Sequence, residues 1–391
     1  MERYVMKNQK RLRCGITTGT CAAAAAKAAA ELFLAGRLRQ EISILTPKGV
    51  EVSVPVSLVS AQENGVCFRV IKDSGDDPDV TDGTAVEVSL KRAEPAEISP
   101  ETFHDSRFPG LYLDGGRGVG RVTQKGLEQE VGQAAINPVP RSMIFQAVDE
   151  VRALTEPEEA LLILVSVPEG ERLAERTFNP RLGISGGLSI LGTSGILEPM
   201  SEKAIVDTIA LEIGQLARLG KKRLLVMPGN YGQSYAQEYL RLDLENSVRC
   251  SNYIGETIDL AAGYGMESFL LVGNIGKLVK LAAGIMNTHS RTADGRGEIM
   301  AVHAVLCGAD RETAAALMSC INTDEMLSVL EEQGIREAVI KSLCEKIQEH
   351  LNRRSGGQMR CGAVLFSERF GFLGQTEEAA GLLEKYRRER R

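Results

Sequence analysis

The sequence predicts a two-domain protein. An α+β domain over residues 1–155 is followed by a three-layer, Rossmann-like α/β domain over residues 156–391, whose sheet is mostly parallel and which ends in a helical extension. Three observations carry this prediction. The chain has 391 residues, which is too long for one small core. Its first third mixes one alanine-rich helical pattern with short strand patterns, and beyond residue 155 strands alternate with longer helices.

The amino-terminal elements follow from local propensities. Thr17–Thr20 precedes Cys21 and a run of alanines. Because threonine is a good N-cap and alanine the best helix former, we expect a helix from near Thr20 to near Gly36. The β-rich runs 41–45 and 50–56 flank Pro47-Lys48-Gly49 and predict a hairpin, and alternating patterns predict further strands at 66–71 and 85–90.

The carboxyl-terminal elements alternate in type, which is typical of βαβ units with parallel strands. We expect strands at 161–167, 223–227, 268–272 and 361–366. We expect helices at 201–219 and 253–263, one beginning at Lys277, and others at 298–306, 311–321, 324–332, 335–351 and 377–386.

Composition excludes several function classes. The chain has 46 basic and 52 acidic residues, a net charge of −6 and a pI near 5.6, which argues against a nucleic-acid binder. No apolar run approaches the length of a membrane span, and eight cysteines without a CxxC pair indicate reduced thiols, so we expect a cytoplasmic protein. Four histidines without ligand spacing predict no protein-bound metal.

Two predicted strands end in the same short motif. Gly229-Asn230 follows the strand at 223–227, and Gly273-Asn274 follows the strand at 268–272. Parallel sheets bind ligands at the carboxyl ends of their strands. We therefore expect Gly229, Asn230, Gly273 and Asn274 to contact a ligand.

Two polar segments are further candidates. At Thr17–Thr20, backbone N–H groups and hydroxyls converge at a helix start and would suit a phosphate or a carboxylate, although plain N-capping explains them equally well. The segment 287–296 holds His289, Asp294 and two arginines between apolar helices. It is either a surface connection or part of a site.

Many segments, in order along most of the chain, resemble the cobalt-precorrin-5B C1-methyltransferase (CbiD) family of anaerobic cobalamin biosynthesis. The matching segments are 11–21 (RLRCGITTGTC), 72–79 (KDSGDDPD), 118–123 (GVGRVT), 135–141 (AINPVPR), 179–199, 228–230 (PGN), 276–281 (GKLVKL), 287–290 (NTHS) and 293–296 (ADGR).

This resemblance implies methyl transfer from S-adenosylmethionine to ring carbon C1 of a cobalt-containing tetrapyrrole, cobalt-precorrin-5B, giving cobalt-precorrin-6A. The cobalt belongs to the substrate. The two Gly-Asn loops would bind the donor, and the cleft would lie between the domains. The acetate and propionate groups of the substrate need local cations and N–H donors, for which the candidates are Thr17, Thr18, Thr20, Arg141, Lys277 and Lys280.

The resemblance leaves some roles open. No acid follows the strand at 223–227 to bind the donor ribose, so the partner would be Asn230, or else Asp294 or Glu298. Asp294 would accept the ribose hydroxyls or handle a proton together with His289, and Arg291 and Arg296 would pair with substrate carboxylates.

Two competing functions remain. The glycine-rich turns would suit a small-molecule kinase, but the G-x-x-x-x-G-K-[ST] loop is absent. A tetrapyrrole carrier would bind the macrocycle and have no affinity for the methyl donor. Neighbouring pathway enzymes are possible partners; nucleic acid and membrane are not expected.

Overall fold

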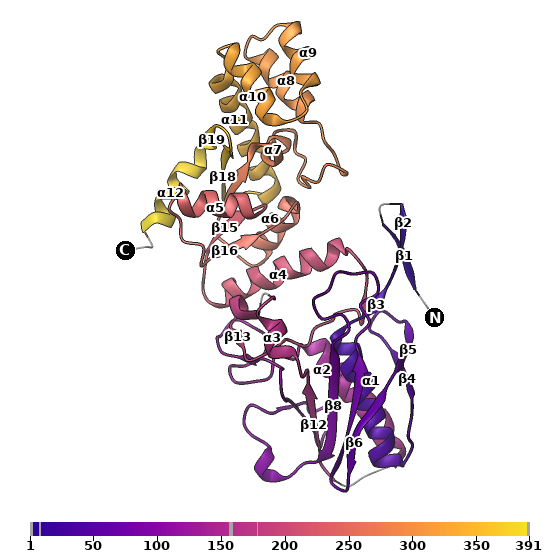
Figure 1. The fold of residues 1–391 in the computed structure, drawn as a ribbon. Helices are drawn as coiled ribbons and strands as arrows, with labels where there is room; N and C mark the ends of the chain where they lie inside the picture. The colour runs from indigo at the N-terminus through magenta and orange to yellow at the C-terminus, as the bar shows by residue number, and fades with distance from the viewer. Residues whose placement is uncertain (1–2, 8, 156–158, 178, 389–391) are drawn as a thin grey trace. The chain divides into compact units, whose positions relative to one another are not determined.

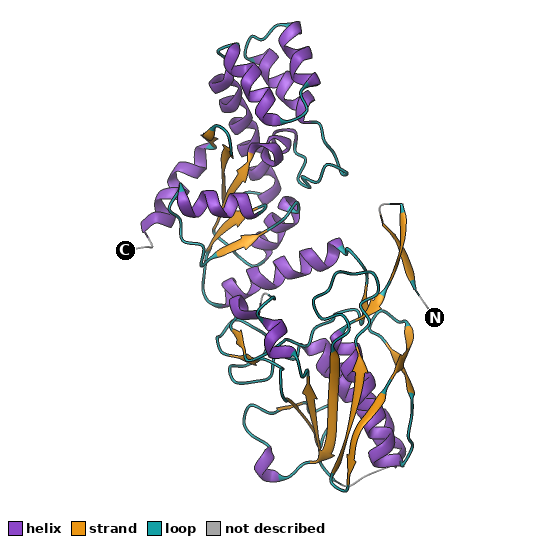
Figure 2. Ribbon diagram, in the orientation of Figure 1, coloured by secondary structure: helices purple, strands orange, loops and turns teal. Residues whose placement is uncertain are grey.

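The chain divides into two compact units, Met1–Ser201 (unit 1) and Glu202–Arg391 (unit 2). The computed structural model describes residues 3–7, 9–155, 159–177 and 179–388. Figure 1 shows the order of the elements along the chain, and Figure 2 shows that unit 1 is rich in strands while unit 2 is rich in helices.

Unit 1 is built on a mixed six-stranded sheet with the strand order β6-β7-β8-β12-β10-β9. Only β10 and β12 pair in parallel; the other neighbours are antiparallel. The strands are β6 (Ser57–Gln62), β7 (Gly65–Ile71), β8 (Ala85–Arg92), β9 (Phe103–His104), β10 (Leu111–Gly115) and β12 (Leu161–Ser166).

Two helices cover this sheet, α1 (Thr18–Ala35) and α2 (Pro138–Thr155). Alanines 22–26 and 28–30 of α1 are fully buried against α2 and against β7 and β8, because a methyl side chain lets backbones approach closely. Thr17 is the N-cap, and Gly36 ends the helix in the left-handed conformation with φ +65°. The predicted alanine-rich helix is confirmed.

Short two-stranded ribbons surround this core. The predicted hairpin is confirmed as β4 (Glu41–Leu45) paired with β5 (Glu51–Pro55). The other pairs are β1 (Tyr4–Lys7) with β2 (Lys10–Arg13), β3 (Gly15–Ile16) with β14 (Ile196–Leu197), and β11 (Arg121–Val122) with β13 (Ile184–Ser185). Short helical turns are η1 (Pro95–Glu97), α3 (Gly170–Ala174) and η2 (Asn179–Leu182).

The division between the units lies later than the boundary near residue 155 that the sequence predicts. The strand at 161–167, which the sequence assigns to the second domain, is β12 and lies inside the sheet of unit 1. It pairs with β8 on one side and β10 on the other, and Leu161, Ile163 and Val165 are fully buried there. The later strands β13 and β14 pair with β11 and β3, so the chain stays in unit 1 as far as Ser201.

Unit 2 is a three-layer α/β unit with a mostly parallel sheet in the order β16-β15-β17-β18-β19. Only the edge strand β19 is antiparallel. The strands are β15 (Arg223–Met227), β16 (Ser247–Arg249), β17 (Ser268–Asn274), β18 (Arg360–Ser367) and β19 (Gly371–Gln375). The sequence missed β16, which has three residues.

Alternate residues of the strands face two separate cores. Leu225 and Met227 pack with α5 (Asn230–Glu238) and α12 (Glu377–Arg388). Leu224 and Val226 pack on the other face with α4 (Glu202–Arg218), α6 (Ile254–Gly263) and α11 (Arg336–Ser355). The helical part is completed by α7 (Ile275–Leu278), η3 (Val279–Ala283), α8 (Arg296–Leu306), α9 (Arg311–Ser319) and α10 (Thr323–Glu332), close to the predicted ranges.

Candidate functional site

The two Gly-Asn motifs lie side by side at the carboxyl edge of the sheet of unit 2: Gly229-Asn230 follows β15, and Gly273-Asn274 forms the last two residues of β17. β15 and β17 are parallel neighbours, with Val226 opposite Leu271, so both strands end at the same edge. The chain leaves β15 through α5 on one face and returns through α6 on the other. This reversal is the topological switch point, where open α/β sheets form their ligand crevice.

The loop after β15 brings helix α5 close to the sheet. Gly232 lies in its first turn, where an added Cβ would approach the carbonyl oxygen of Val272 to 2.7 Å. The side-chain oxygen of Asn230 accepts a hydrogen bond from Arg249 Nη1 at 3.1 Å. Arg249 is the last residue of β16, so this bond joins the ends of two neighbouring strands.

Asn274 and Lys277 complete this edge. Asn274 caps α7, accepting the backbone N–H of Gly276 at 2.8 Å. The ammonium of Lys277 lies 3.3 Å from the carbonyl of Pro228 and 3.5 Å from that of Ser251. Burial lowers the pKa of Lys277. Lys277 thus places a half-buried cation between the loops that follow β15 and β16.

The segment 287–294 is attached to the same edge. The N–H of Thr288 donates to the carbonyl of Asn252 at 3.0 Å, and Asn252 follows β16. Lys280 fixes the segment from the other side, since its ammonium donates to the carbonyls of Thr288 at 3.1 Å and Ala293 at 2.8 Å. The switch-point loops and the predicted polar segment therefore gather at one edge of unit 2.

Lys280 is turned into the protein. Its side chain is only 2% exposed, and Asp294 is its nearest carboxylate at 3.8 Å. Burial lowers its pKa, with Asp294 acting in the opposite direction. Both carbonyl partners belong to the chain, so this geometry gives Lys280 a structural role instead of the substrate contact that the sequence predicts.

Asp294 and His289 are both exposed on this segment. Arg296 donates to both carboxylate oxygens of Asp294, at 2.6 and 3.0 Å, and this pairing lowers the pKa of Asp294. The N–H of Arg291 donates to Nδ1 of His289 at 3.1 Å, which leaves the ring proton on Nε2. Asp294 is thus suited to accept hydrogen bonds and poorly suited to take up a proton, and Arg296 is already paired within the protein.

The predicted anion site at the start of α1 is occupied by the chain itself. Thr17, Thr18 and Thr20 are buried in unit 1. The Thr20 hydroxyl donates to the carbonyl of Gly195 at 2.7 Å, and the Thr18 hydroxyl donates to that of Leu191 at 3.5 Å. The geometry therefore favours the capping alternative for these threonines.

The glycine-rich stretch 179–199 covers this helix start. Gly192 has φ +134°, and a Cβ there would lie 2.3 Å from the hydroxyl oxygen of Thr17. The lack of a side chain at Gly192 therefore lets this stretch pack closely against Thr17.

Arg141 is also a core residue. It is 6% exposed, and its guanidinium lies 3.9 Å from the ring centroid of Phe103. It donates to the carbonyl of Ile136 at 2.7 Å and to the side-chain oxygen of Gln133 at 3.1 Å. Burial lowers the pKa of Arg141 to about 10. Arg141 therefore supports the fold of unit 1, contrary to the predicted substrate contact.

Sequence reasoning missed three residues of the unit 2 edge. Arg249 ends β16 and Asn252 lies three residues further along the chain. The sequence of β16 is short and polar, so it does not predict a strand. Tyr231 lies in the first turn of α5 and is 66% exposed. An exposed tyrosine beside the Gly-Asn motif could have been noticed as a stacking surface.

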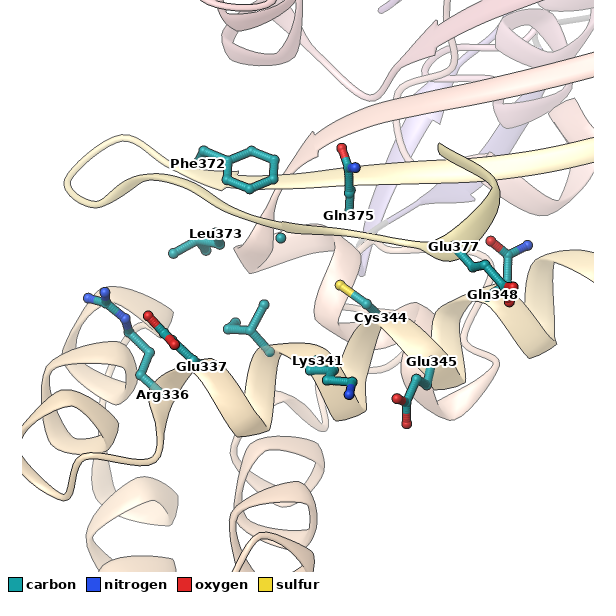
Figure 3. Close-up of a pocket in the computed structure, with 12 residues that line it drawn as sticks. Arg336, Glu337, Lys341, Cys344, Glu345, Gln348, Phe372, Leu373, Gln375 and Glu377 are labelled. Atoms are coloured by element: carbon teal, nitrogen blue, oxygen red, sulfur yellow. The ribbon is translucent and has the colours of Figure 1, made fainter. Parts of the chain in front are cut away.

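Two cavities in unit 2 contain no predicted site residue. One of 790 Å³ lies between α11 and the edge strand β19, with Cys344 facing it and charged residues along its rim (Figure 3). Another of 570 Å³ lies between α8 and α11 and includes His303, whose Nδ1 is 2.8 Å from the hydroxyl of Ser342. Among the described residues, no helix is long and apolar enough to cross a membrane, and no group of three or more metal-ligating side chains is assembled.

Comparison with known proteins finds family models, curated proteins and a crystal structure that all point to the same family. A family model described as CbiD matches residues 5–199, and one described as CbiD, C-terminal domain, matches residues 287–377. The cobalt-precorrin-5B C(1)-methyltransferase of Ruminiclostridium cellulolyticum is 46% identical, covering 94% of this chain and 92% of its own length. That of Alkaliphilus metalliredigens is 40% identical, covering 98% and 97%. A crystal structure of cobalamin biosynthesis protein CbiD from Archaeoglobus fulgidus is 27% identical, covers 75% of this chain and 88% of its own, and has a TM-score of 0.39.

Proposed function

Because the chain belongs to the CbiD family, we propose that it transfers a methyl group from S-adenosylmethionine to C1 of cobalt-precorrin-5B, giving cobalt-precorrin-6A in cobalamin biosynthesis. The observation that carries this proposal is the switch point of unit 2, where Gly229-Asn230, which follows β15, neighbours Gly273-Asn274 at the end of β17. Soluble metabolites are the substrates of such a step, which supports a cytoplasmic location.

Unit 2 binds the donor in the manner of a Rossmann-like domain. An added Cβ at Gly229 would meet nothing within 4 Å, so a ligand can approach the backbone at the end of β15, whereas the space beside Gly273 is filled by the side chain of Leu278. The side-chain amides of Asn230 and Asn274 supply hydrogen bonds, and the exposed ring of Tyr231 supplies a surface on which adenine stacks.

Asp294 accepts the ribose hydroxyls of the donor. No carboxylate follows β16 directly, since its last residue Arg249 is followed by Cys250, Ser251 and Asn252. The segment holding Asp294 is bonded to Asn252 through Thr288, which brings a carboxylate to this edge from another part of the chain. Its lowered pKa keeps it ionised and favours this role over proton transfer. His289 remains the candidate that offers a proton donor, Nε2–H, to the substrate.

Methyl transfer from a sulfonium needs little acid or base catalysis from the protein. The methyl carbon of a sulfonium is already electrophilic, and the C–S bond breaks as the new C–C bond forms, releasing a neutral thioether. The protein therefore acts mainly by holding donor and ring carbon in line, an effect of up to about 7–11 kcal/mol in favourable cases, and by excluding water. Lys277 supplies a cation at this edge for a carboxylate of either ligand.

A calorimetric titration of the full chain tests the proposal. S-adenosylhomocysteine is expected to bind and ATP is not. Methyl transfer from a labelled donor to cobalt-precorrin-5B is expected as well. Binding of ATP alone would indicate a kinase, and binding of the macrocycle without the donor would indicate a carrier; either result overturns the proposal.

A pair of variants on helix α5 locates the donor site. Asn230→Ala is expected to weaken S-adenosylhomocysteine binding about tenfold, through loss of one hydrogen bond at the crevice. Gln237→Ala removes an exposed amide from the same helix and is expected to leave binding unchanged. Equal affinities in both variants would exclude the loop after β15 as the donor site.

A further inference from the structure

The ribbon β1–β2 concentrates positive charge at the amino terminus of unit 1. From Arg3 to Arg13 the sequence contains five basic residues and no acidic one, although the whole chain has a net charge of −6. None of the described residues of the two strands is buried. The ribbon stands apart from the six-stranded sheet of unit 1 (Figures 1 and 2).

The strand register places like charges opposite each other. Lys7 pairs with Lys10 near the tip of the ribbon, so both side chains lie on the same face. Like charges directly opposite each other destabilise a sheet, and an isolated two-stranded ribbon is only marginally stable. Among the described residues, neither lysine forms an ion pair. A bound anion would relieve this repulsion.

The opposite face combines flat apolar surface with a cation. Tyr4 and Met6 lie on it, with Arg11 directly across from Met6. The guanidinium of Arg11 lies 3.9 Å from the ring centroid of Tyr4, and Met6 is 68% exposed. Stacking on tyrosine orders the guanidinium plane and leaves its N–H edge available to an anion.

The base of the ribbon is fixed to unit 1. Arg13 donates to both carboxylate oxygens of Asp73, at 2.5 and 2.7 Å, and its backbone N–H donates to Asp76 at 2.6 Å. The N–H of Cys14 donates to the carbonyl of Arg3 at 2.7 Å. Arg13 is therefore an anchor, whereas Lys10 and Arg11 are exposed and Lys7 is half-buried near the carboxylate of Glu198, whose pKa its charge helps to lower.

The cations of the ribbon can pair with substrate carboxylates in place of Arg141 and Lys280, two of the residues that the sequence predicts for this role. Arg141 and Lys280 direct their charges to groups of the protein itself. We propose that the β1–β2 ribbon binds the substrate, with Lys7, Lys10 and Arg11 pairing with its acetate and propionate groups and the Tyr4–Met6 face lying against the conjugated ring. This proposal rests on the proposed function, since it takes a carboxylate-edged macrocycle as the ligand.

Substrate titrations with the full chain at several salt concentrations test the ribbon. The variant Lys7→Gln/Lys10→Gln/Arg11→Gln is expected to bind cobalt-precorrin-5B at least about tenfold more weakly than the wild type, with a shallower salt dependence. Its affinity for S-adenosylhomocysteine is expected to be unchanged. Because the substitutions remove the Lys7–Lys10 repulsion, the melting temperature is not expected to fall.

A matched control removes the same charge elsewhere. Arg37→Gln/Lys125→Gln/Arg176→Gln neutralises three exposed cations of unit 1 outside the ribbon and is expected to keep wild-type substrate affinity. Equal losses in both variants, or no loss in the ribbon variant, would overturn the proposal. So would a ribbon variant that keeps substrate affinity and loses only binding to phosphatidylserine vesicles. A wild type that binds no S-adenosylhomocysteine contradicts the proposed function instead, and the two failures are thus distinguishable.

Discussion

Replacing Lys280 by methionine should release the segment 287–294 from the edge of the sheet. The substitution keeps an unbranched side chain of similar length but removes the ammonium that donates to the carbonyls of Thr288 and Ala293. It also removes one of the two cations near Asp294, leaving Arg296 as its partner. No other described contact of these two carbonyls replaces the lost donor.

The structure sets the size of the effect. A buried carbonyl left without a donor costs about 1–3 kcal/mol. Thr288 is buried, whereas Ala293 is half-buried and can regain a bond from water. Removing a buried ammonium, whose pKa is lowered by burial, offsets part of the loss. We expect a net loss of about 2 kcal/mol in the unfolding of unit 2, or about 4–8 °C in its melting temperature.

The local effect should exceed the global one. Hydrogen exchange followed by mass spectrometry is expected to show lost protection in the amides of 287–295 and little change in β15 and β17. If the segment positions Asp294 at the donor, its release should lower turnover about 10- to 100-fold, because small displacements of positioning groups are costly.

A matched variant separates this effect from general loss of charge. Lys346→Met removes an exposed lysine on α11 that pairs only with Glu349 among its described partners, and it should change neither exchange at 287–295 nor turnover. Unchanged exchange and unchanged turnover in Lys280→Met would refute the assignment of Lys280 as the residue that holds this segment. Lost turnover with intact protection would instead support the direct substrate contact that the sequence predicts.

Three further variants are expected to behave as follows. Asp294→Asn should weaken S-adenosylhomocysteine binding about tenfold at neutral pH. Because the pKa of Asp294 lies below its ordinary value of 3.8, the contribution of Asp294 to binding in the wild type should persist as pH falls to about 4 and be lost below that. Wild-type binding that already weakens near pH 6 would contradict this expectation. Lys277→Met should lower kcat/KM about tenfold without changing the melting temperature by more than a few degrees, and unchanged kinetics would exclude a ligand contact. Thr20→Val removes the bond to the Gly195 carbonyl and should cost unit 1 about 1–2 kcal/mol with unchanged substrate affinity; weaker substrate binding at intact stability would restore the predicted anion site.

The sequence by itself determined the elements whose causes are local. The alanine run with threonine before it and Gly36 after it specifies α1, and Pro47-Lys48-Gly49 between β-rich runs specifies the β4–β5 hairpin. Helical periodicity located α8 to α11 to within a few residues. The repeated Gly-Asn motif also identified the edge of the sheet where two strands end together, because parallel neighbours must end on the same side.

Only the tertiary structure decided which sheet a strand joins and where a charge points. The apolar run of β12 fits either sheet, and its pairing with β8 and β10 is what assigns it to unit 1. Arg141 and Lys280 read as available cations in the sequence, yet both are buried with backbone carbonyls as partners. Lys7 and Lys10 lie three residues apart in the sequence, but the register of the ribbon decides that they pair directly opposite each other. Burial and pairing depend on residues distant along the chain, so local propensity carries no information about them.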